Sequence, residues 1–152
     1  MDPIQFNRAG DDYGWLSNSA PYPITLDGFM WHTAEHYFQA QKFYDEAVKR
    51  TIRKTRLAND VLKIASNPKL RVRRDWDEVK IESMFTAVRA KFTQIPDLNM
   101  LLLGTGDAEL IAHTADDSYW GDGGDGSGKN NLGAILMDVR DELRLQSARS
   151  TK

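Results

Sequence analysis

Residues 24–45 read ITLDGFMWHTAEHYFQAQKFYD, and the first eight of them carry a clear turn signal. Two short apolar runs, Ile24–Leu26 and Phe29–Trp31, flank the pair Asp27-Gly28. Asp-Gly between two such runs is typical of the tight turn of a β-hairpin, because both residues tolerate positive φ. We therefore expect a β-hairpin over residues 24–31.

The sequence after the hairpin predicts a mostly helical chain. Thr33 is a suitable N-cap, and Glu35 stands in the first turn, where a carboxylate stabilises the helix dipole. Helices are expected over residues 34–45, 46–66 with a break near Asn59, 76–94 after an Asp75 cap, 96–104 and 132–145, with a short strand over 109–114. These elements predict a predominantly helical α+β fold with a small hairpin, in a single domain over residues 1–152 with frayed ends at about 1–5 and 146–152.

Length and composition limit the class of protein. A chain of 152 residues with 41% hydrophobic and 28% charged residues lies in the globular range, which argues against a disordered or fibrous chain. Apolar runs such as Met100–Leu103 are far shorter than the roughly 20 residues of a membrane helix. The chain has no cysteine, and its first residues lack the pattern of a secretory signal. We therefore expect a cytoplasmic protein without a membrane partner, and the oligomeric state stays open.

The net charge of −2 conceals an uneven distribution of charged residues. Residues 47–91 contain 13 Lys or Arg and 5 Asp or Glu, a local balance of +8, so the rest of the chain carries −10. A basic segment of this kind attracts phosphate groups and nucleic acid. The alternative is a set of solvated helix faces, and the sequence leaves both interpretations open.

The helix expected over residues 34–45 presents one polar stripe. At about 100° per residue, four polar residues fall on that stripe: Glu35, Gln39, Lys42 and Glu46. Phe38 and Phe43 border it, and aromatic neighbours are typical of a lined cleft. Partial desolvation in a cleft would lower the pKa of Lys42, as an amine nucleophile requires, and would make Glu35 more basic. The alternative is a charged face in contact with solvent.

Glycine is concentrated in one segment, which we call the glycine loop (residues 119–133) and which contains six of the 11 glycines. Gly123–Lys129 has the G-x-x-x-x-G-K spacing of a nucleotide-binding loop, but an asparagine follows where Ser or Thr would hold magnesium. The spacing of the acids does not match a calcium loop either. The loop instead combines Tyr119-Trp120, Asp122 and Lys129-Asn130, which supply the stacking surface, carboxylate and anion contact of a nucleoside site.

The histidines and serines give no sign of metal or serine chemistry. His32, His36 and His113 do not have the spacing of a metal site, so structural or substrate-contacting roles fit them better. No serine lies in a G-x-S-x-G elbow. We therefore expect neither a metal nor an organic cofactor.

Four blocks of this sequence resemble one known family. They are YGWLSN at residues 13–18, WHTAEHYFQAQKF at 31–43, YWGDG at 119–123 and GKNNLG at 128–133. On these residues the chain is similar to the NADAR family, the NAD and ADP-ribose associated group that includes the YbiA-like N-glycosidases. The resemblance extends from about Tyr13 to Leu145, which is nearly the whole expected domain.

The resemblance implies a hydrolase that cleaves the bond between a ribose carbon and a nitrogen. By position in the blocks, it implies three catalytic residues: Glu35 as the acid/base carboxylate, Lys42 as the amine that traps the opened sugar as a Schiff base, and Asp122, which also shapes the site around the ribose. Either Asp122 or Glu35 would stabilise the positive charge that develops on the sugar. The implied substrate-binding residues are Gly14, Asn18, Trp31, Gln39, Trp120, Lys129 and Asn130. Where the family often has an aromatic residue after the first block, this chain has Ser19, which leaves the preferred base open.

The leading hypothesis is an N-glycosidase that hydrolyses phosphorylated ribosylaminopyrimidine intermediates of riboflavin biosynthesis and releases ribose 5-phosphate. Its partner is then a phosphorylated, nucleoside-like small molecule, and the glycine loop is expected to face the helix that carries Glu35. One alternative is an ADP-ribosylguanine hydrolase, in which the basic segment would contact nucleic acid. The others are a non-catalytic module that binds ADP-ribose or NAD, and a purely structural helical adaptor.

Overall fold

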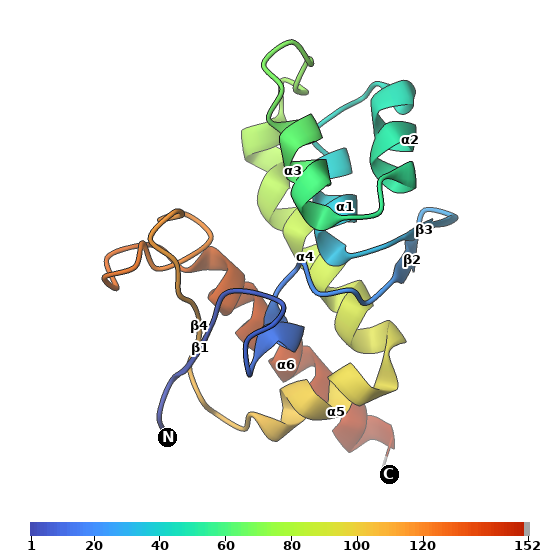
Figure 1. Cartoon of the computed structure of the whole chain (residues 1–152). Helices are drawn as coiled ribbons and strands as arrows, with labels where there is room; N and C mark the ends of the chain where they lie inside the picture. Colours follow the sequence, from blue (N-terminus) through green and yellow to red (C-terminus); the bar gives the residue numbers. More distant parts are fainter. Residues whose placement is uncertain (151–152) are drawn as a thin grey trace. The chain divides into compact units, whose positions relative to one another are not determined.

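The computed structural model describes residues 1–150 and contains, in that part of the chain, six α-helices, one short 3-10 helix and four short strands (Figure 1). The described chain divides into two compact units: unit 1, which is Met1–Ser17 with the residues from Phe92 onward, and unit 2, which is Asn18–Lys91. The mostly helical content with small strands confirms the predicted α+β class. Within residues 1–150, none of the helices is both long enough and apolar enough to span a bilayer.

Unit 2 contains the predicted hairpin. β2 (Ile24–Leu26) pairs antiparallel with β3 (Phe29–Trp31) across a two-residue turn. Both turn residues have positive φ, 56° at Asp27 and 81° at Gly28, which is the conformation that an Asp-Gly turn favours. The hairpin is therefore confirmed at the predicted residues.

The start of α1 (Ala34–Ala40) is held by two side chains. The hydroxyl oxygen of Thr33 accepts a hydrogen bond from the N–H of His36 at 3.2 Å, which confirms the predicted N-cap. The His36 ring is fully buried, and its Nε2 donates to the carbonyl of Thr55 at 2.7 Å while its Nδ1 lies 2.7 Å from the Thr33 hydroxyl. Burial lowers the pKa of His36, in keeping with a neutral ring that joins α1 to the segment after α2.

The end of α1 differs from the prediction. The helix ends at Ala40 rather than at residue 45, and Phe43, which follows the helix, is completely buried in the core of unit 2. Asp45, the expected last residue, instead caps α2 (Glu46–Lys54) by accepting a hydrogen bond from a backbone N–H of its first turn at 2.9 Å. Aspartate favours this position over a helix end, since its carboxylate pairs with the unsatisfied N–H groups there. The helix predicted over residues 34–45 is therefore wrong in its last turn.

Two more helices complete unit 2. The break predicted near Asn59 lies at residues 55–57, and Asn59 is inside α3 (Ala58–Ala65). α4 (Trp76–Gln94) begins directly after Asp75, as predicted, and its last three residues belong to unit 1. The hydrophobic core of unit 2 consists of Ile24, Trp31, Ala34, Tyr37, Ala40, Phe43, Ile52, Val61, Ala65, Ala87 and Ala90.

Unit 1 combines the two ends of the chain. β1 (Ile4–Phe6) pairs in parallel with β4 (Leu110–Ala112), and Ile4 lies opposite Leu110. β4 confirms the strand predicted over residues 109–114. β1 was not predicted, because three residues near a terminus carry too little pattern to distinguish a strand from the frayed end expected there.

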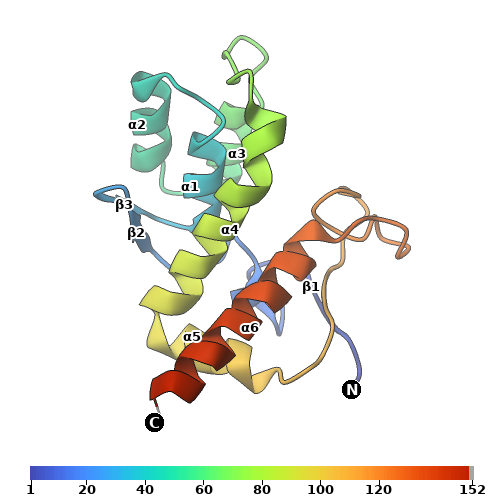
Figure 2. The same cartoon turned by 180° about the vertical axis from the view of Figure 1, so that it is seen from behind.

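α6 (Asn131–Ser150) packs against β4, and α5 (Pro96–Gly104) packs against α6. α5 begins and ends as predicted, and the short η1 (Gly14–Leu16) was not predicted. α6 is longer than the helix expected over 132–145, so the tail expected to be frayed is helical as far as Ser150. The last two residues of that expected tail, 151 and 152, lie outside the described residues. In both views the glycine loop lies at the N-terminal end of α6 (Figures 1 and 2).

Candidate active site

Glu35 lies on a partly exposed face in the first turn of α1. Gln39, one turn later, donates a hydrogen bond from Nε2 to Oε1 of Glu35 at 2.7 Å. The N–H of Glu35 donates to the carbonyl of Asn18 at 3.1 Å, so the chain before the hairpin fixes the start of the helix. The structure therefore places Glu35 and Gln39 together on one helix face, as predicted.

Lys42 lies in the turn after α1 rather than on the helix. Its N–H donates to the carbonyl of Gln39 at 3.2 Å, and its Nζ donates to the carbonyl of Ala65 at 3.3 Å. Burial lowers the pKa of Lys42, and the negative charge of Glu35 acts in the opposite direction. The lowered pKa favours the neutral amine that a nucleophile requires. The carboxylate and the amine predicted to work together are thus close enough to interact.

The fourth member of the predicted stripe lies elsewhere. Glu46 begins α2, and its carboxylate pairs with Arg53 at 2.9 Å. The guanidinium of Arg53 also lies 3.9 Å from the centre of the Phe29 ring. The four-residue stripe is therefore wrong, because α1 ends at Ala40, and only Glu35 and Gln39 share a helix.

Two of the residues predicted to bind substrate are buried inside unit 2. The Trp31 side chain donates from Nε1 to the carbonyl of Leu26 at 3.1 Å, and its ring packs edge-on against Tyr37 at 5.5 Å. Asn18 donates from Nδ2 to Sδ of Met84 at 3.0 Å. Trp31 is 2% exposed and Asn18 is 6% exposed, so both side chains stabilise unit 2 from within.

Asp122 is a buried carboxylate at the centre of the glycine loop. Its Oδ2 accepts a hydrogen bond from Nδ1 of His113 at 2.7 Å, and its Oδ1 accepts from the N–H groups of Thr114 at 3.1 Å and Gly124 at 2.9 Å. The hydrogen bond from His113 is the largest cause that holds the pKa of Asp122 below its ordinary value. Asp122 therefore joins the glycine loop to the segment that follows β4.

Asn130 and Gly14 have roles in shaping the backbone. Asn130 has a φ of 52°. Its side chain hydrogen-bonds to the backbone of β4, where it accepts from the N–H of Ala112 at 2.9 Å and donates to the carbonyl of Leu110 at 3.0 Å. A side chain at Gly14 would overlap the carbonyl oxygen of Ala9. Local structure thus accounts for both residues without a substrate.

Trp120 and Lys129 keep accessible side chains in the glycine loop. The rings of Tyr119 and Trp120 pack edge to face at 4.9 Å, and the N–H groups of both residues donate to Oδ1 of Asp117 at 2.9 Å. Nζ of Lys129 lies 5.5 Å from the centre of the Tyr119 ring. The stacking surface and the cation of the predicted nucleoside site are therefore next to each other.

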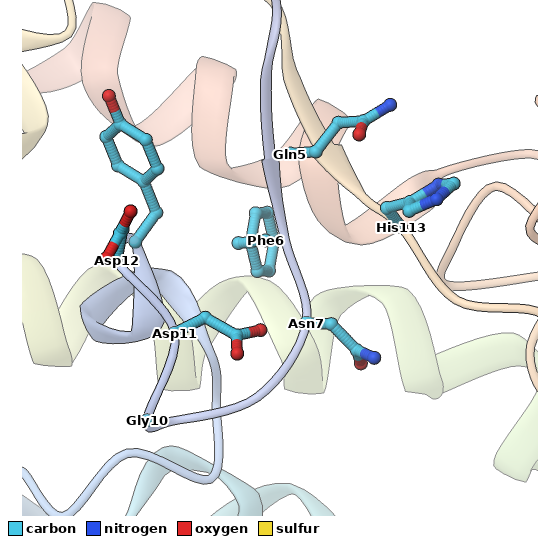
Figure 3. Close-up of a pocket in the computed structure, with 8 residues that line it drawn as sticks. Gln5, Phe6, Asn7, Gly10, Asp11, Asp12 and His113 are labelled. Carbon is cyan, nitrogen blue, oxygen red and sulfur yellow. The ribbon is translucent and has the colours of Figure 1, made fainter.

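His113 is a candidate to which the sequence assigned no specific role. Its side chain is 43% exposed, while the buried Asp122 fixes the position of its Nδ1. It lines a cavity of about 630 Å³ together with Gln5 and Asn7 from the N-terminal segment (Figure 3). His113 and Asp122 are nine residues apart in the sequence, and the fold brings them together. No local sequence pattern therefore indicates that they pair. Within residues 1–150, no group of three or more His, Cys, Asp or Glu side chains is placed to hold a metal ion.

The predicted site residues are divided between the two units. Unit 2 contains Asn18, Trp31, Glu35, Gln39 and Lys42, whereas unit 1 contains Gly14, Trp120, Asp122, Lys129 and Asn130. Within unit 2 the structure brings Glu35, Gln39 and Lys42 together. That the glycine loop faces α1 stays a prediction.

Comparison with known proteins identifies the relatives of the chain. A family profile described as the NADAR domain matches residues 5–144. N-glycosidase YbiA of Escherichia coli (strain K12) is 46% identical over 143 residues, which cover 94% of this chain and 89% of that protein. The NMR structure of E. coli YbiA has a TM-score of 0.90 at 44% identity, and the match covers 97% of this chain and 88% of that structure.

Two further relatives have similar coverage of this chain. Riboflavin biosynthesis protein VVA0006 of Vibrio vulnificus (strain YJ016) is 42% identical over 93% of this chain, which corresponds to 39% of that longer protein. N-glycosidase Npun_R5314 of Nostoc punctiforme (strain ATCC 29133 / PCC 73102) is 38% identical over 93% of this chain and 92% of that protein. The chain is therefore a homologue of N-glycosidase YbiA with a YbiA-like fold, as the sequence resemblance implied.

Proposed function

This chain belongs to the NADAR family, and we propose that it is an N-glycosidase that hydrolyses phosphorylated ribosylaminopyrimidine intermediates of riboflavin biosynthesis and releases ribose 5-phosphate. The observation that carries the proposal is the arrangement of Glu35, held by Gln39 at 2.7 Å, with Lys42 in the turn that follows the same helix, where burial lowers the pKa of the amine. The names of the relatives support it, since two are N-glycosidases and the Vibrio protein is a riboflavin biosynthesis protein. The expected cytoplasmic location stays a prediction.

The reaction breaks the bond between C1 of the ribose and a nitrogen of the base. In the ring-opened sugar C1 belongs to an imine, and the neutral Nζ of Lys42 forms a new bond to that carbon. The carboxylate of Glu35 takes up the protons that Nζ of Lys42 loses as it adds to C1 and delivers them to the departing nitrogen, so the base leaves as an amine and Lys42 remains joined to C1 as a Schiff base. Water then adds to C1, and ribose 5-phosphate leaves as Lys42 is regenerated. One water is consumed for each base released.

The surroundings of the two groups suit these steps. The carboxylate of Glu35 stabilises the positive charge that develops on C1 and on the Schiff base. Gln39 orients that carboxylate through the 2.7 Å hydrogen bond. The scheme uses the side chains of this chain and water.

Incubation of the full chain with a ribosylaminopyrimidine phosphate tests the proposal. We expect release of ribose 5-phosphate, and we expect borohydride added during turnover to reduce the Schiff base and leave the sugar on Lys42, where peptide mass spectrometry can locate it. Lys42→Ala should abolish both signals, whereas Lys54→Ala, at an exposed position of α2, should change neither. Full activity of Lys42→Ala would contradict its assigned role. Ligand recovered intact from the unaltered chain would support the non-catalytic binding module instead.

Guanine that carries ADP-ribose in a nucleic acid is the second candidate substrate. The observation that favours it is the charge balance of +8 over residues 47–91. A parallel incubation with an ADP-ribosylated oligonucleotide distinguishes the two. If the nucleic acid is the substrate, kcat/KM falls steeply as the salt concentration rises, because counterions compete for the phosphate contacts. A salt-insensitive reaction on the small substrate alone excludes this candidate.

A further inference from the structure

The loop between α3 and α4, which we call the arginine loop (residues 66–75), carries most of the positive charge at one end of unit 2. It extends beyond the ends of both helices in the two views (Figures 1 and 2). Four cationic residues lie within it against one acid: Lys69, Arg71, Arg73 and Arg74, with Asp75. Exposed cations are satisfied by water, but several of them close together attract an anionic ligand.

Arg73 is fully paired and anchors the loop. Its Nε and Nη2 donate to the two carboxylate oxygens of Asp75 at 2.6 and 2.9 Å, and its guanidinium lies 4.5 Å from the centre of the Tyr44 ring. The hydrogen bonds from Arg73 lower the pKa of Asp75 to about 2. The N–H of Arg73 donates to the carbonyl of Lys42 at 2.8 Å. The arginine loop is thus fixed to the backbone of the proposed nucleophile.

Arg71 and Arg74 are not paired in this way. Both are exposed, and neither guanidinium has an ion-pair or hydrogen-bond partner among residues 1–150. They line a cavity of about 580 Å³ with Tyr44 and Val72, whose side chains are 66% and 42% exposed. The two acids at the same cavity are already engaged, because Asp45 caps α2 and Asp75 pairs with Arg73.

We propose that Arg71 and Arg74 form a phosphate-binding groove, with the Tyr44 ring as the surface against which the planar group of a phosphate ester lies. Guanidinium groups bind phosphate oxygens through paired N–H donors, and an exposed aromatic ring beside them stacks a base. The phosphate ester belongs either to a small nucleotide-like substrate or to a nucleic-acid backbone. The inference rests on the proposed function only for the identity of the ligand, since binding to the groove is measured without turnover.

Binding measurements on the full chain test the groove. The probes are adenosine 5′-monophosphate, followed by amide chemical shifts, and a fluorescent single-stranded oligonucleotide, followed by anisotropy. The altered chain is Arg71→Gln/Arg74→Gln, and the matched control is Arg50→Gln/Arg56→Gln, which removes the same charge from exposed positions of the same unit. We expect at least a tenfold loss of affinity in the first chain and no loss in the control. Unchanged thermal midpoints establish that both chains are folded.

The two probes distinguish the sources of the phosphate. Saturable binding of adenosine 5′-monophosphate, with shifts at Tyr44 and Arg74, assigns the groove to a small phosphate monoester. Oligonucleotide binding assigns it to nucleic acid, and the slope of log K against log salt should then become less negative by about 1.4 in Arg71→Gln/Arg74→Gln, since each contact to a single strand contributes about 0.7.

Other results would overturn the groove. These are no saturable binding of either probe, or an equal loss of affinity in the Arg50→Gln/Arg56→Gln control. The failure of the proposed function has a different signature. Phosphate binding that depends on Arg71 and Arg74 without any cleavage contradicts the N-glycosidase alone, whereas cleavage with binding unaffected by their replacement contradicts the groove alone.

Discussion

The carboxylates of Glu35 in unit 2 and Asp122 in unit 1 each lie beside a nitrogen-bearing side chain. Their surroundings differ. Glu35 is partly exposed, accepts a hydrogen bond from Gln39 and acts on the pKa of Lys42. Asp122 is 5% exposed and accepts hydrogen bonds from one side chain and two backbone N–H groups.

This contrast separates two uses of a carboxylate within one family's sequence blocks. A carboxylate saturated by backbone donors is held in its charged form and fixes a loop. One that is partly exposed beside an amine of lowered pKa is placed to exchange protons. Both residues stand in the blocks that resemble the family, so the blocks contain architecture as well as chemistry. The predictions below test this division.

Replacement of the Glu35 carboxylate is expected to have the largest effect. Glu35→Gln should lower kcat by about 10²–10⁴ because it removes the acid/base group. The negative charge of Glu35 raises the pKa of Lys42, so its removal should lower that pKa further and shift the acid limb of the pH–rate profile to lower pH. Steady-state kinetics across pH measure both effects. An acid limb that does not shift in Glu35→Gln would contradict the interaction between Glu35 and Lys42.

Asp122→Asn is expected to lower the stability of the fold more than the rate of the reaction. Weakened hydrogen bonds to His113, Thr114 and Gly124 should cost about 2–3 kcal/mol in the free energy of unfolding, measured with denaturant. The pKa of Asp122 is lowered in the folded chain, so its stabilisation is present above the unfolded value of 3.8 and is lost as the pH falls through the folded value. The variant should therefore lose less stability than the unaltered chain below about pH 4. Normal stability with lost activity would instead make Asp122 catalytic.

Lys91 is a second lysine whose pKa is lowered by burial. It therefore tests whether a lowered pKa alone makes a lysine of this chain reactive. It is 1% exposed, and desolvation lowers its pKa to about 7. Between about pH 7 and 10.5 the unfolded chain binds the proton and the folded chain does not, so stability should rise with pH by up to about 1.4 kcal/mol per unit. Lys91→Met should remove that rise, and borohydride should leave no sugar on Lys91. An adduct on Lys91 would break the assignment of the nucleophile to Lys42.

The smallest effect is expected at Lys129. Its ammonium lies over the Tyr119 ring on the surface, so Lys129→Ala should change the free energy of unfolding by only about 0.5–1 kcal/mol. If it contacts the substrate phosphate as predicted, KM rises while kcat stays close to its original value. An unchanged KM would place Lys129 with Asp122 among the residues that only shape the loop.

The parts of the fold that the sequence predicted have local causes. Asp27-Gly28 suits a turn with positive φ, Thr33 caps a helix through its own hydroxyl, and Pro96 fits the first turn of α5. The parts that were missed depend on distant partners. Phe43, just after the end of α1, is buried in the core of unit 2, and β1 pairs with β4 from a distant part of the sequence.

The residues of the candidate site also differ in whether the sequence or only the fold indicates their role. The sequence predicted Glu35 and Lys42 as a pair, and the structure places Lys42 in the turn after the helix that carries Glu35, where burial lowers the pKa of the amine. Trp31 and Asn130 stand in the same blocks, but their side chains make packing and backbone contacts that only the fold reveals. A sequence block indicates that a residue type is required at a position. The contacts in the structure show which role the residue has.

The parallel pairing of β1 with β4 also has a consequence for the order in which the chain folds during synthesis. All of unit 2 is contiguous, whereas β1 leaves the ribosome roughly 100 residues before its partner β4. At about 5–20 residues per second, that interval lasts on the order of 5–20 s. The nascent chain therefore completes the helices of unit 2 while its own first strand is still unpaired, and the glycine loop takes its shape only after translation has passed it.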